Sequence, residues 1–314
     1  MKRILAFLCV FILTVSLFGC GKTSQQSDDA GLSVVATIFP AYDFARAVVG
    51  DDGSVSMLIK PGTEIHTYDP TTADIAKIQA CDVFIYNGGE ADAWVDTVLD
   101  SIDTSHMTII CMMDAVTPVE EETVEGMEAE QEAHDATEIA YDEHIWTAPA
   151  NAILIVCAIR DAMCKLDPIN TEAYCENSDS YVLQIQDVQQ EIKTIVSQAK
   201  HKMIVVGDRF PFRYFAEEFG LDYRAAFNGC SEDTEASAST IAYLIDTIEQ
   251  NDLSAVFYIE LSNQQIAKAI SEQTGAQMLE LNSCHNISQK NFDSGLTYAD
   301  IMKQNAENLK IGLN

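Results

Sequence analysis

Basic residues are scarce in this sequence. Its 314 residues include 49 aspartates and glutamates but only 18 lysines and arginines, which gives a formal net charge of −31 at pH 7. A surface of this sign repels phosphate backbones, so nucleic-acid binding is excluded as a function. It attracts cations, although net charge alone does not make a binding site.

Sequence motifs of enzymes are missing as well. The chain has no P-loop, no HExxH pair and no serine–histidine–aspartate arrangement, which are signatures of nucleotide hydrolases, metalloproteases and serine hydrolases. We therefore predict a protein that binds its ligand and is not an enzyme.

The cysteines do not form the pattern of a disulfide framework. There is no CxxC pair among the nine, and seven remain when Cys9 and Cys20 of the N-terminal region are set aside. An odd number cannot pair completely. Cys81, Cys111 and Cys157 lie in apolar runs and are predicted to be small core residues.

The N-terminal apolar run is too short to span a membrane comfortably. Lys2 and Arg3 precede fifteen residues, Ile4–Phe18, and this organisation is typical of a signal peptide. The run ends in LFGC, which resembles the lipobox of bacterial lipoproteins and implies that Cys20 is acylated and becomes the mature N-terminus. An ordinary secreted protein cleaved near this point is the alternative.

Behind the signal, strands alternate with helices, which is typical of an α/β fold with mostly parallel sheets flanked by helices. We predict a signal peptide (1–19), a polar lipid-anchored tether (20–31), an N-terminal α/β lobe (32–168), a linking helix (169–200) and a C-terminal α/β lobe (201–314). The linking helix is predicted because Thr171–Lys200 contains no proline or glycine; it would be about 40 Å long and join the two lobes.

Each lobe is predicted to have four strands. These cover 33–39, 54–60, 82–87 and 107–113 in the first lobe, and 202–206, 221–226, 255–259 and 277–281 in the second. The predicted helices cover 42–49, 70–80, 91–101, 150–166, 212–219, 240–250, 264–274 and 297–313.

The stretch KPGTEIHTYDP, Lys60–Pro70, places a histidine where ligands bind. Asp69 before Pro70 signals a helix start, because aspartate caps free N–H groups and proline suits the first helical position. His66 therefore lies on a loop between the carboxyl end of a strand and a helix, where open α/β sheets bind ligands. By itself, a lone loop histidine is also compatible with an ordinary surface residue.

A second unusual stretch is strongly acidic. Residues 120–143 contain eleven carboxylates and one histidine, His134, but no lysine or arginine. We predict a long, solvated, mobile loop. Whether it gathers cations or is only a hydrated insert stays open.

Further histidines and carboxylates follow other predicted strands. The set comprises His66 and His144 in the first lobe, and Asp208, Glu260 and His285 with neighbouring Cys284 in the second. Ligands of these types that converge from separate loops are what a four-coordinate transition-metal site needs, and a metal held by both lobes would clamp them together. Asp208 and Glu260 are also compatible with helix caps or structural ion pairs.

These motifs resemble those of the metal-binding solute-binding lipoproteins of bacterial zinc/manganese-type ABC importers, from Val34 onward. PGTEIHTYDP resembles the first ligand motif of that family and DEHIWTAP (142–149) the second, which implies His66 and His144 as ligands. FRYFAEEFGLDY (212–223) and TEASASTIAYLI (234–245) resemble later blocks, and the acidic loop lies where zinc-binding members carry a histidine-rich loop.

The sequence departs from the family at the third ligand. The family has a histidine or glutamate five residues before the tyrosine of the YFA element, and this position is Arg209, which is permanently cationic and cannot bind a metal. Either Asp208 reaches the ion instead, or the second lobe contributes differently. The family's fourth ligand corresponds to His285. Cys284 is either a further ligand or the disulfide partner of Cys230.

The resemblance implies a monomeric receptor, lipid-anchored to the outer face of the cell membrane, which binds a divalent metal in the cleft between its lobes and delivers it to an ABC permease and its ATPase. Three imidazoles with a carboxylate or water favour zinc, whereas manganese prefers more oxygen ligands. A manganese- or iron-binding member is the alternative within the family. A surface adhesin and a zinc hydrolase with Glu260 as general base are alternatives of other classes.

Overall fold

The computed structural model describes residues 31–63, 68–128, 140–231 and 235–314. The predicted signal peptide, the tether with Cys20, His66 and His134 lie outside the described residues. Among the described helices, none combines the length and the apolar character needed to cross a membrane.

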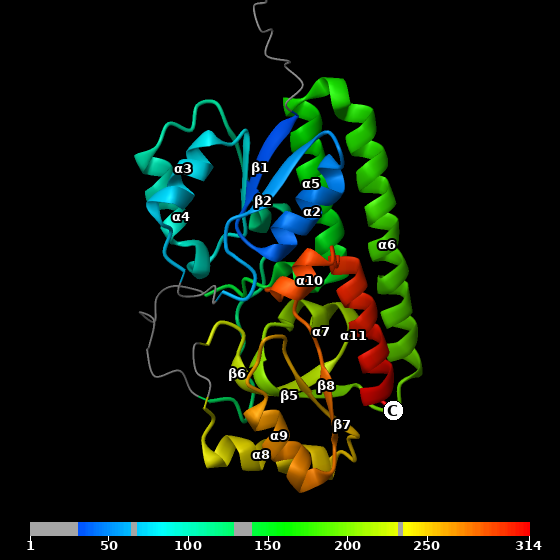
Figure 1. Ribbon diagram of the computed structural model, residues 1–314. Helices are drawn as coiled ribbons and strands as arrows, with labels where there is room; N and C mark the ends of the chain where they lie inside the picture. The colour runs from blue at the N-terminus through cyan, green and yellow to red at the C-terminus, as the bar shows by residue number, and fades with distance from the viewer. Residues whose placement is uncertain (1–30, 64–67, 129–139, 232–234) are drawn as a thin grey trace, which may run out of the picture. The chain divides into compact units, whose positions relative to one another are not determined.

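Each half of the chain forms a four-stranded sheet (Figure 1). The first sheet has the order β2-β1-β3-β4; its strands are β1 (Leu32–Ala36), β2 (Gly53–Met57), β3 (Val83–Tyr86) and β4 (Thr108–Cys111). The second has the order β6-β5-β7-β8; its strands are β5 (Met203–Phe210), β6 (Asp222–Asn228), β7 (Ala255–Tyr258) and β8 (Gln277–Glu280). All neighbouring strands are parallel, which confirms the predicted α/β class.

Helices connect the strands. Those of the first half are α2 (Phe39–Val49), α3 (Thr72–Ala80), α4 (Trp94–Ser101) and α5 (Pro149–Leu166). Those of the second half are α7 (Arg213–Phe219), α8 (Ala238–Gln250), α9 (Gln265–Thr274), α10 (Gln289–Asp293) and α11 (Tyr298–Gly312). The short α10 was not predicted from the sequence.

The long helix α6 (Thr171–Gln198) packs against helices of both halves. Its 28 residues correspond to about 42 Å, and it contacts α2 and α5 of the first half and α11 of the second (Figure 1). Its buried residues Tyr181, Ile185, Val188 and Ile192 recur at helical spacing and form one face. The predicted linking helix is therefore confirmed.

Both faces of each sheet are covered, as parallel sheets require. Because successive strand side chains point to opposite faces, Val34 and Ala36 of β1 belong to a large core shared by both halves, whereas Val35 belongs to a separate core with residues of α3 and α4. In the second half, Val205 of β5 lies in a third core with residues of α8 and α9.

The helix after the predicted first ligand loop begins later than the sequence predicted. It starts at Thr72, with Thr71 as its N-cap in place of Asp69. The Thr71 hydroxyl accepts the Asp74 N–H at 3.3 Å, and the Asp74 carboxylate accepts the Thr71 N–H at 3.1 Å. This reciprocal capping box satisfies two free donors at once, which a single aspartate cap does not.

Strand β5 is longer than predicted. Gly207 was expected to follow the strand, but β5 continues to Phe210, with a shift of its register against β6 between Val206 and Arg209. A Cβ atom on Gly207 would lie 2.7 Å from the Ala267 backbone of α9. The glycine therefore permits close packing of a helix on the strand and does not end it.

Candidate functional site

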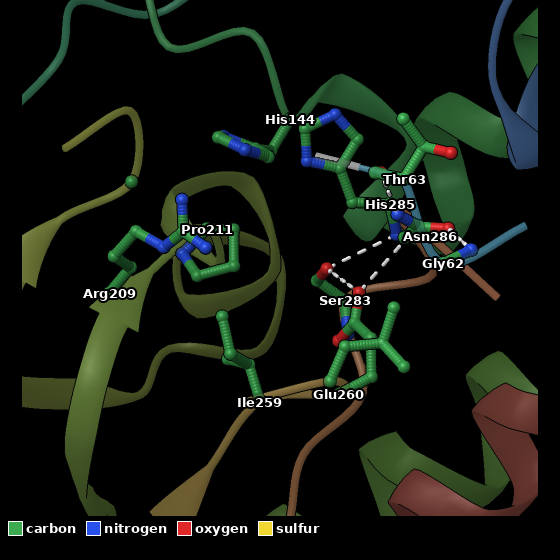
Figure 2. Close-up of a pocket in the computed structure, with 12 residues that line it drawn as sticks. Gly62, Thr63, His144, Arg209, Pro211, Ile259, Glu260, Ser283, His285 and Asn286 are labelled. Atoms are coloured by element: carbon green, nitrogen blue, oxygen red, sulfur yellow. Dashed lines mark hydrogen bonds between the residues drawn. The ribbon is translucent and has the colours of Figure 1, made fainter. Parts of the chain in front are cut away.

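A pocket of about 190 Å³ lies where strands of both sheets end (Figure 2). Its walls come from the loops after β2, β6, β7 and β8, from the end of β5, and from the segment before α5. The lining residues are Gly62, Thr63, His144, Arg209, Pro211, Gly229, Ile259, Glu260, Leu261, Ser283, His285 and Asn286. This is the edge at which open parallel sheets bind ligands.

His144 is held in a defined orientation by a neighbouring carboxylate. Its imidazole is buried, and its Nδ1 lies 3.1 Å from Oδ1 of Asp142, which also accepts the His144 backbone N–H at 2.8 Å. The Tyr214 hydroxyl donates to the Asp142 carbonyl at 2.8 Å and thereby anchors this segment to α7. Nε2 is consequently the ring nitrogen suited to bind a metal.

Burial and a nearby carboxylate shift the pKa of His144 in opposite directions. Burial alone would lower the pKa of His144, but Asp142, through its charge and hydrogen bond, raises it above the usual 6.5. Burial raises the pKa of Glu143 to about 7, although Glu143 accepts the Ala91 N–H at 2.9 Å. Asp142 is thus the electrostatic partner of His144.

His285 stands beside His144 and comes from the other half of the chain. The ring centroids of the two imidazoles are 5.0 Å apart and their planes lie at 88° (Figure 2). Trp146 lies 5.0 Å from the His285 ring and donates its indole N–H to the Ser283 carbonyl at 2.8 Å. The indole therefore ties the loop after β8 to the segment that carries His144.

Glu260 lies under the same loop. Ser283 donates to its carboxylate through the backbone N–H at 2.7 Å and the hydroxyl at 2.6 Å, and the Asn286 N–H donates at 3.4 Å. Burial raises the pKa of Glu260, and the bonds from Ser283 lower it. These contacts support the structural interpretation of Glu260, which organises the loop that presents His285.

Asp208 and Arg209 lie on β5 but differ in their surroundings. The Asp208 carboxylate accepts the Ser262 hydroxyl and, at 2.9 Å, the Arg209 N–H. Burial raises the pKa of Asp208, and this residue is not among those that line the pocket. Arg209 does line it, and its Nη1 donates to the Ser231 carbonyl at 3.2 Å.

Cys284 is buried in the large core and is not among the lining residues, and burial raises the pKa of its thiol. It adopts a positive φ of 60°, which turns the backbone just before His285. Cys230 and Cys284 are both free thiols in the structure, as are the other five cysteines among the described residues.

His66 lies outside the described residues, but the backbone that leads to it reaches the pocket. Gly62 donates its N–H to the Asn286 side chain at 3.0 Å, and the Asn286 amide donates to the Thr63 carbonyl at 2.5 Å. No sequence motif signals this role of Asn286. The role of Asp142 was not predicted either, although it has a local signal, an acid two residues before the histidine.

The donor set is compatible with zinc. With Zn–N bonds of about 2.0–2.1 Å, two imidazoles on a tetrahedral ion place their ring centroids about 5 Å apart, and His144 and His285 show 5.0 Å. Within the described part of the chain, no group of three or more histidine, cysteine, aspartate or glutamate side chains is arranged to hold a metal. Among the described residues, His144 and His285 are the two imidazoles that this pocket brings together.

Comparison with known proteins shows which family has this architecture. Residues 34–312 match the family model described as zinc-uptake complex component A, periplasmic. The chain is 32% identical over 307 residues to the high-affinity zinc uptake system protein ZnuA of Bacillus subtilis, with 96% of this chain and 94% of that protein covered. It is 31% identical to the zinc-binding lipoprotein AdcA of Streptococcus pneumoniae over 99% of its own length, which spans only 61% of that relative.

Solved structures agree with the sequence matches. The Zn(II)-bound ZnuA-like domain of S. pneumoniae AdcA has a TM-score of 0.75 and 28% identity, covering 90% of this chain and 99% of that domain. The metal-dependent lipoprotein YcdH of B. subtilis has a TM-score of 0.74 and 31% identity, covering 90% and 100%. The family consists of transport components, not enzymes. With its two parallel sheets, its long shared helix and a match over nearly its whole length, the chain belongs to the zinc-uptake complex component A family.

Proposed function

We propose that this protein is an extracytoplasmic receptor that captures zinc in the pocket between the ends of its two sheets and delivers it to an ABC permease for uptake. The observation that carries the proposal is the pair His144–His285, because two imidazoles from opposite halves of the chain face each other at the spacing of zinc ligands. Membership of a zinc-uptake family and the zinc-binding names of the relatives support the same cargo.

The proposed ligands are His66, His144 and His285. Asp142 orients His144 and makes Nε2 the metal-binding atom. Gly62 and Thr63 at the pocket wall support the placement of His66 nearby. Asp208 remains a candidate for the fourth position, although it would have to exchange its bond from Ser262 for the metal.

A site rich in imidazole favours zinc over manganese, which prefers oxygen ligands. Manganese or iron as cargo is the alternative within the family. Zinc held between loops of both sheets would hold the two halves in one arrangement, which a permease can recognise.

The N-terminal assignments belong to the same proposal. Residues 1–19 are the signal peptide and 20–31 a tether anchored through acylated Cys20 to the outer face of the cell membrane, followed by the two lobes (32–168 and 201–314) and the helix that links them (169–200). The partners are then a permease and its ATPase, and the receptor acts as a monomer.

The test is zinc binding, measured by competition calorimetry on His144→Ala and His285→Ala. Each change removes a ligand and is expected to weaken zinc binding more than about 100-fold, because even loss of a residue that only orients a ligand costs about 10–100-fold. His106→Ala is the matched control, since His106 is exposed, its Nε2 lies 3.0 Å from the Gln79 carbonyl, and it is not among the residues that line the pocket. Wild-type zinc affinity in both ligand variants would refute the site.

A further inference from the structure

Two consecutive helices of the molecule, α5 and α6, form a hairpin with a short connection. They pack side by side (Figure 1) and are joined through Asp167 and a single turn of 3₁₀ helix, Pro168–Asn170. The Asp167 N–H donates to the Met163 carbonyl at 2.8 Å, and the Tyr174 hydroxyl donates to the Asp167 carboxylate at 2.9 Å. These bonds hold the last turn of α5 against the first turn of α6.

The hairpin places two cysteines beside each other. The Thr171 hydroxyl donates to the Cys164 carbonyl at 3.4 Å, and the Cys164 thiol donates to the Thr171 carbonyl at 3.9 Å. Cys164 of α5 therefore lies next to the first turn of α6. Cys175 follows Thr171 by four residues, so it lies on the same face of α6, one turn further on. The two thiols interact, because burial raises the pKa of Cys164 and a hydrogen bond with the Cys175 thiol raises it further.

The surroundings of this pair allow it to react. Both thiols are partly exposed, so a small reagent can reach them, whereas Cys81 and Cys284 are buried. Burial is the main influence on the pKa of Cys164 and raises it, but the charge of Arg160, one turn earlier on α5, lowers it. Because the thiolate is the reactive form of cysteine, a cation beside the pair promotes thiol–disulfide exchange.

We propose that Cys164 and Cys175 form a disulfide bond by exchange with an organic disulfide, and that this bond joins α5 covalently to α6. One protein thiolate attacks a sulfur of the organic disulfide, which forms a mixed disulfide and releases one thiolate. The other protein thiolate then attacks the protein sulfur of the mixed disulfide, forms the Cys164–Cys175 bond and releases a second thiolate. The two protein thiols lose two protons and two electrons, and the organic disulfide becomes two thiols.

The bond ties down the helix that both halves of the chain share, since α6 also contacts α2 and α11. Disulfides form and persist outside the cytoplasm, where the proposed function locates this protein. The inference goes beyond that function and does not depend on zinc binding. The pair lies at the opposite end of α5 from His144, and the 18 residues of this helix span about 27 Å. The bond therefore stabilises the hairpin without reaching the pocket.

The first test is peptide mapping of the full chain after incubation with oxidised glutathione and a zinc chelator. Trypsin cleaves after Arg160 and Lys165, so Cys157, Cys164 and Cys175 fall on three different peptides. Oxidation is expected to join the peptides of Cys164 and Cys175 with the loss of two hydrogen atoms. The number of free thiols, counted in denaturant, is expected to fall by two.

Two serine variants show which thiols react. Cys175→Ser is expected to stop at a glutathione adduct on Cys164. Cys157→Ser is the matched control, because Cys157 lies on α5 seven residues, or about 10 Å, before Cys164, and it is expected to form the bond as the wild type does. Oxidation is expected to raise the melting temperature of the wild type and of Cys157→Ser by about 5 °C and to leave that of Cys175→Ser unchanged.

The outcomes separate this inference from the proposed function. Persistence of both thiols, a stable glutathione adduct on the wild type, or a bond to Cys157 in place of the pair overturns the inference and leaves the proposed function intact. Zinc affinity of the oxidised protein is expected to stay within about twofold of the reduced protein, because distant sites act independently. A larger loss on oxidation contradicts a bond that acts on the hairpin alone. Absence of zinc binding in both forms counts against the proposed function only.

Discussion

Two buried polar clusters of this protein have similar components but opposite organisation. In the first, here called the Asp43 cluster, the Asp43 carboxylate accepts the Arg46 Nε–H at 2.8 Å, the Tyr298 N–H at 2.9 Å and the Tyr181 hydroxyl. Arg46 also donates to the Leu296 carbonyl at 2.9 Å. The cluster thereby joins α2, α6 and α11. In the second, His144 and His285 stand at the pocket.

The difference lies in where the polar groups are directed. In the Asp43 cluster the donors converge on one carboxylate, and although burial raises the pKa of Asp43, Arg46 and the hydrogen bonds oppose that shift. At the pocket, Asp142 holds one nitrogen of His144 and leaves the imidazole ring facing His285. A network closed on itself stabilises the fold, whereas one directed at a cavity is suited to a ligand.

The largest effect is expected from removing the acceptor of the Asp43 cluster, which should lower stability without changing zinc binding. Asp43→Ala leaves the buried Tyr181 hydroxyl and Tyr298 N–H without their acceptor, whereas Arg46 is 27% exposed and keeps its bond to the Leu296 carbonyl. Because an unsatisfied buried donor costs about 1–3 kcal/mol, the change should cost about 3 kcal/mol. We expect the free energy of unfolding, measured in urea, to fall by that amount while zinc affinity of the folded protein is unchanged. Tyr181→Phe deletes a single donor and should cost about 1 kcal/mol.

A surface pair provides the control for this prediction. Arg160 and Asp161 form an ion pair at 2.8 Å in which the Asp161 side chain is 70% exposed, so Asp161→Ala should change stability by less than about 1 kcal/mol. If Asp43→Ala weakened zinc binding as strongly as stability, the two clusters would not be separate in function.

Changing Asp142, which orients the imidazole of His144, should weaken zinc binding and leave stability nearly unchanged. Asp142→Asn keeps the shape but removes the charge that holds Nδ1 of His144, and loss of such a partner typically weakens metal binding about 10–100-fold. We expect that loss in competition calorimetry with little change in the urea midpoint. Asp161→Asn is the matched control for the loss of one negative charge. A large stability loss with unchanged zinc affinity would place Asp142 with the structural cluster instead.

The smallest effect is expected from crowding the pocket. A Cβ atom on Gly229 would lie 3.1 Å from Cε1 and Nδ1 of His144, so Gly229→Ala should displace the ring slightly and weaken zinc binding several-fold. In a His144→Ala background the same change should have a smaller effect, because the crowded ring is gone and only the contact with the Phe210 carbonyl, also at 3.1 Å, remains. Equal effects in both backgrounds would show that Gly229 acts through something other than His144.

The sequence predicted most of the fold because its signals are local. Eight short apolar runs separated by helical patterns correspond to the eight strands, and the uninterrupted stretch after Thr171 is one helix. It misjudged the start of α3 and the end of β5 for a physical reason. The capping box of Thr71 is favoured over a cap by Asp69. Gly207 is needed because α9 packs closely on β5, and no local sequence pattern reveals that contact.

The candidate site was predictable only in part. The DEHIWTAP motif indicated His144, and a position after a predicted strand indicated His285; the structure places both at one pocket. Asp208 and Cys284 were equally plausible from their positions beside strand ends, yet one bonds to Ser262 and the other is buried in the core. Which side of a strand or turn a residue faces depends on register and on a positive φ, and both are set by tertiary packing.

Apolar periodicity and ligand chemistry are properties of the residues, so the sequence was enough to predict the α/β class, the two strand–helix series with the helix between them, and the residue types suited to a transition metal. Three features became evident only in the three-dimensional structure: His144 meets His285, Glu260 supports the loop that carries His285, and Arg209 reaches the same pocket. These residues lie far apart in the chain, and their meeting depends on how the two sheets and the shared core pack.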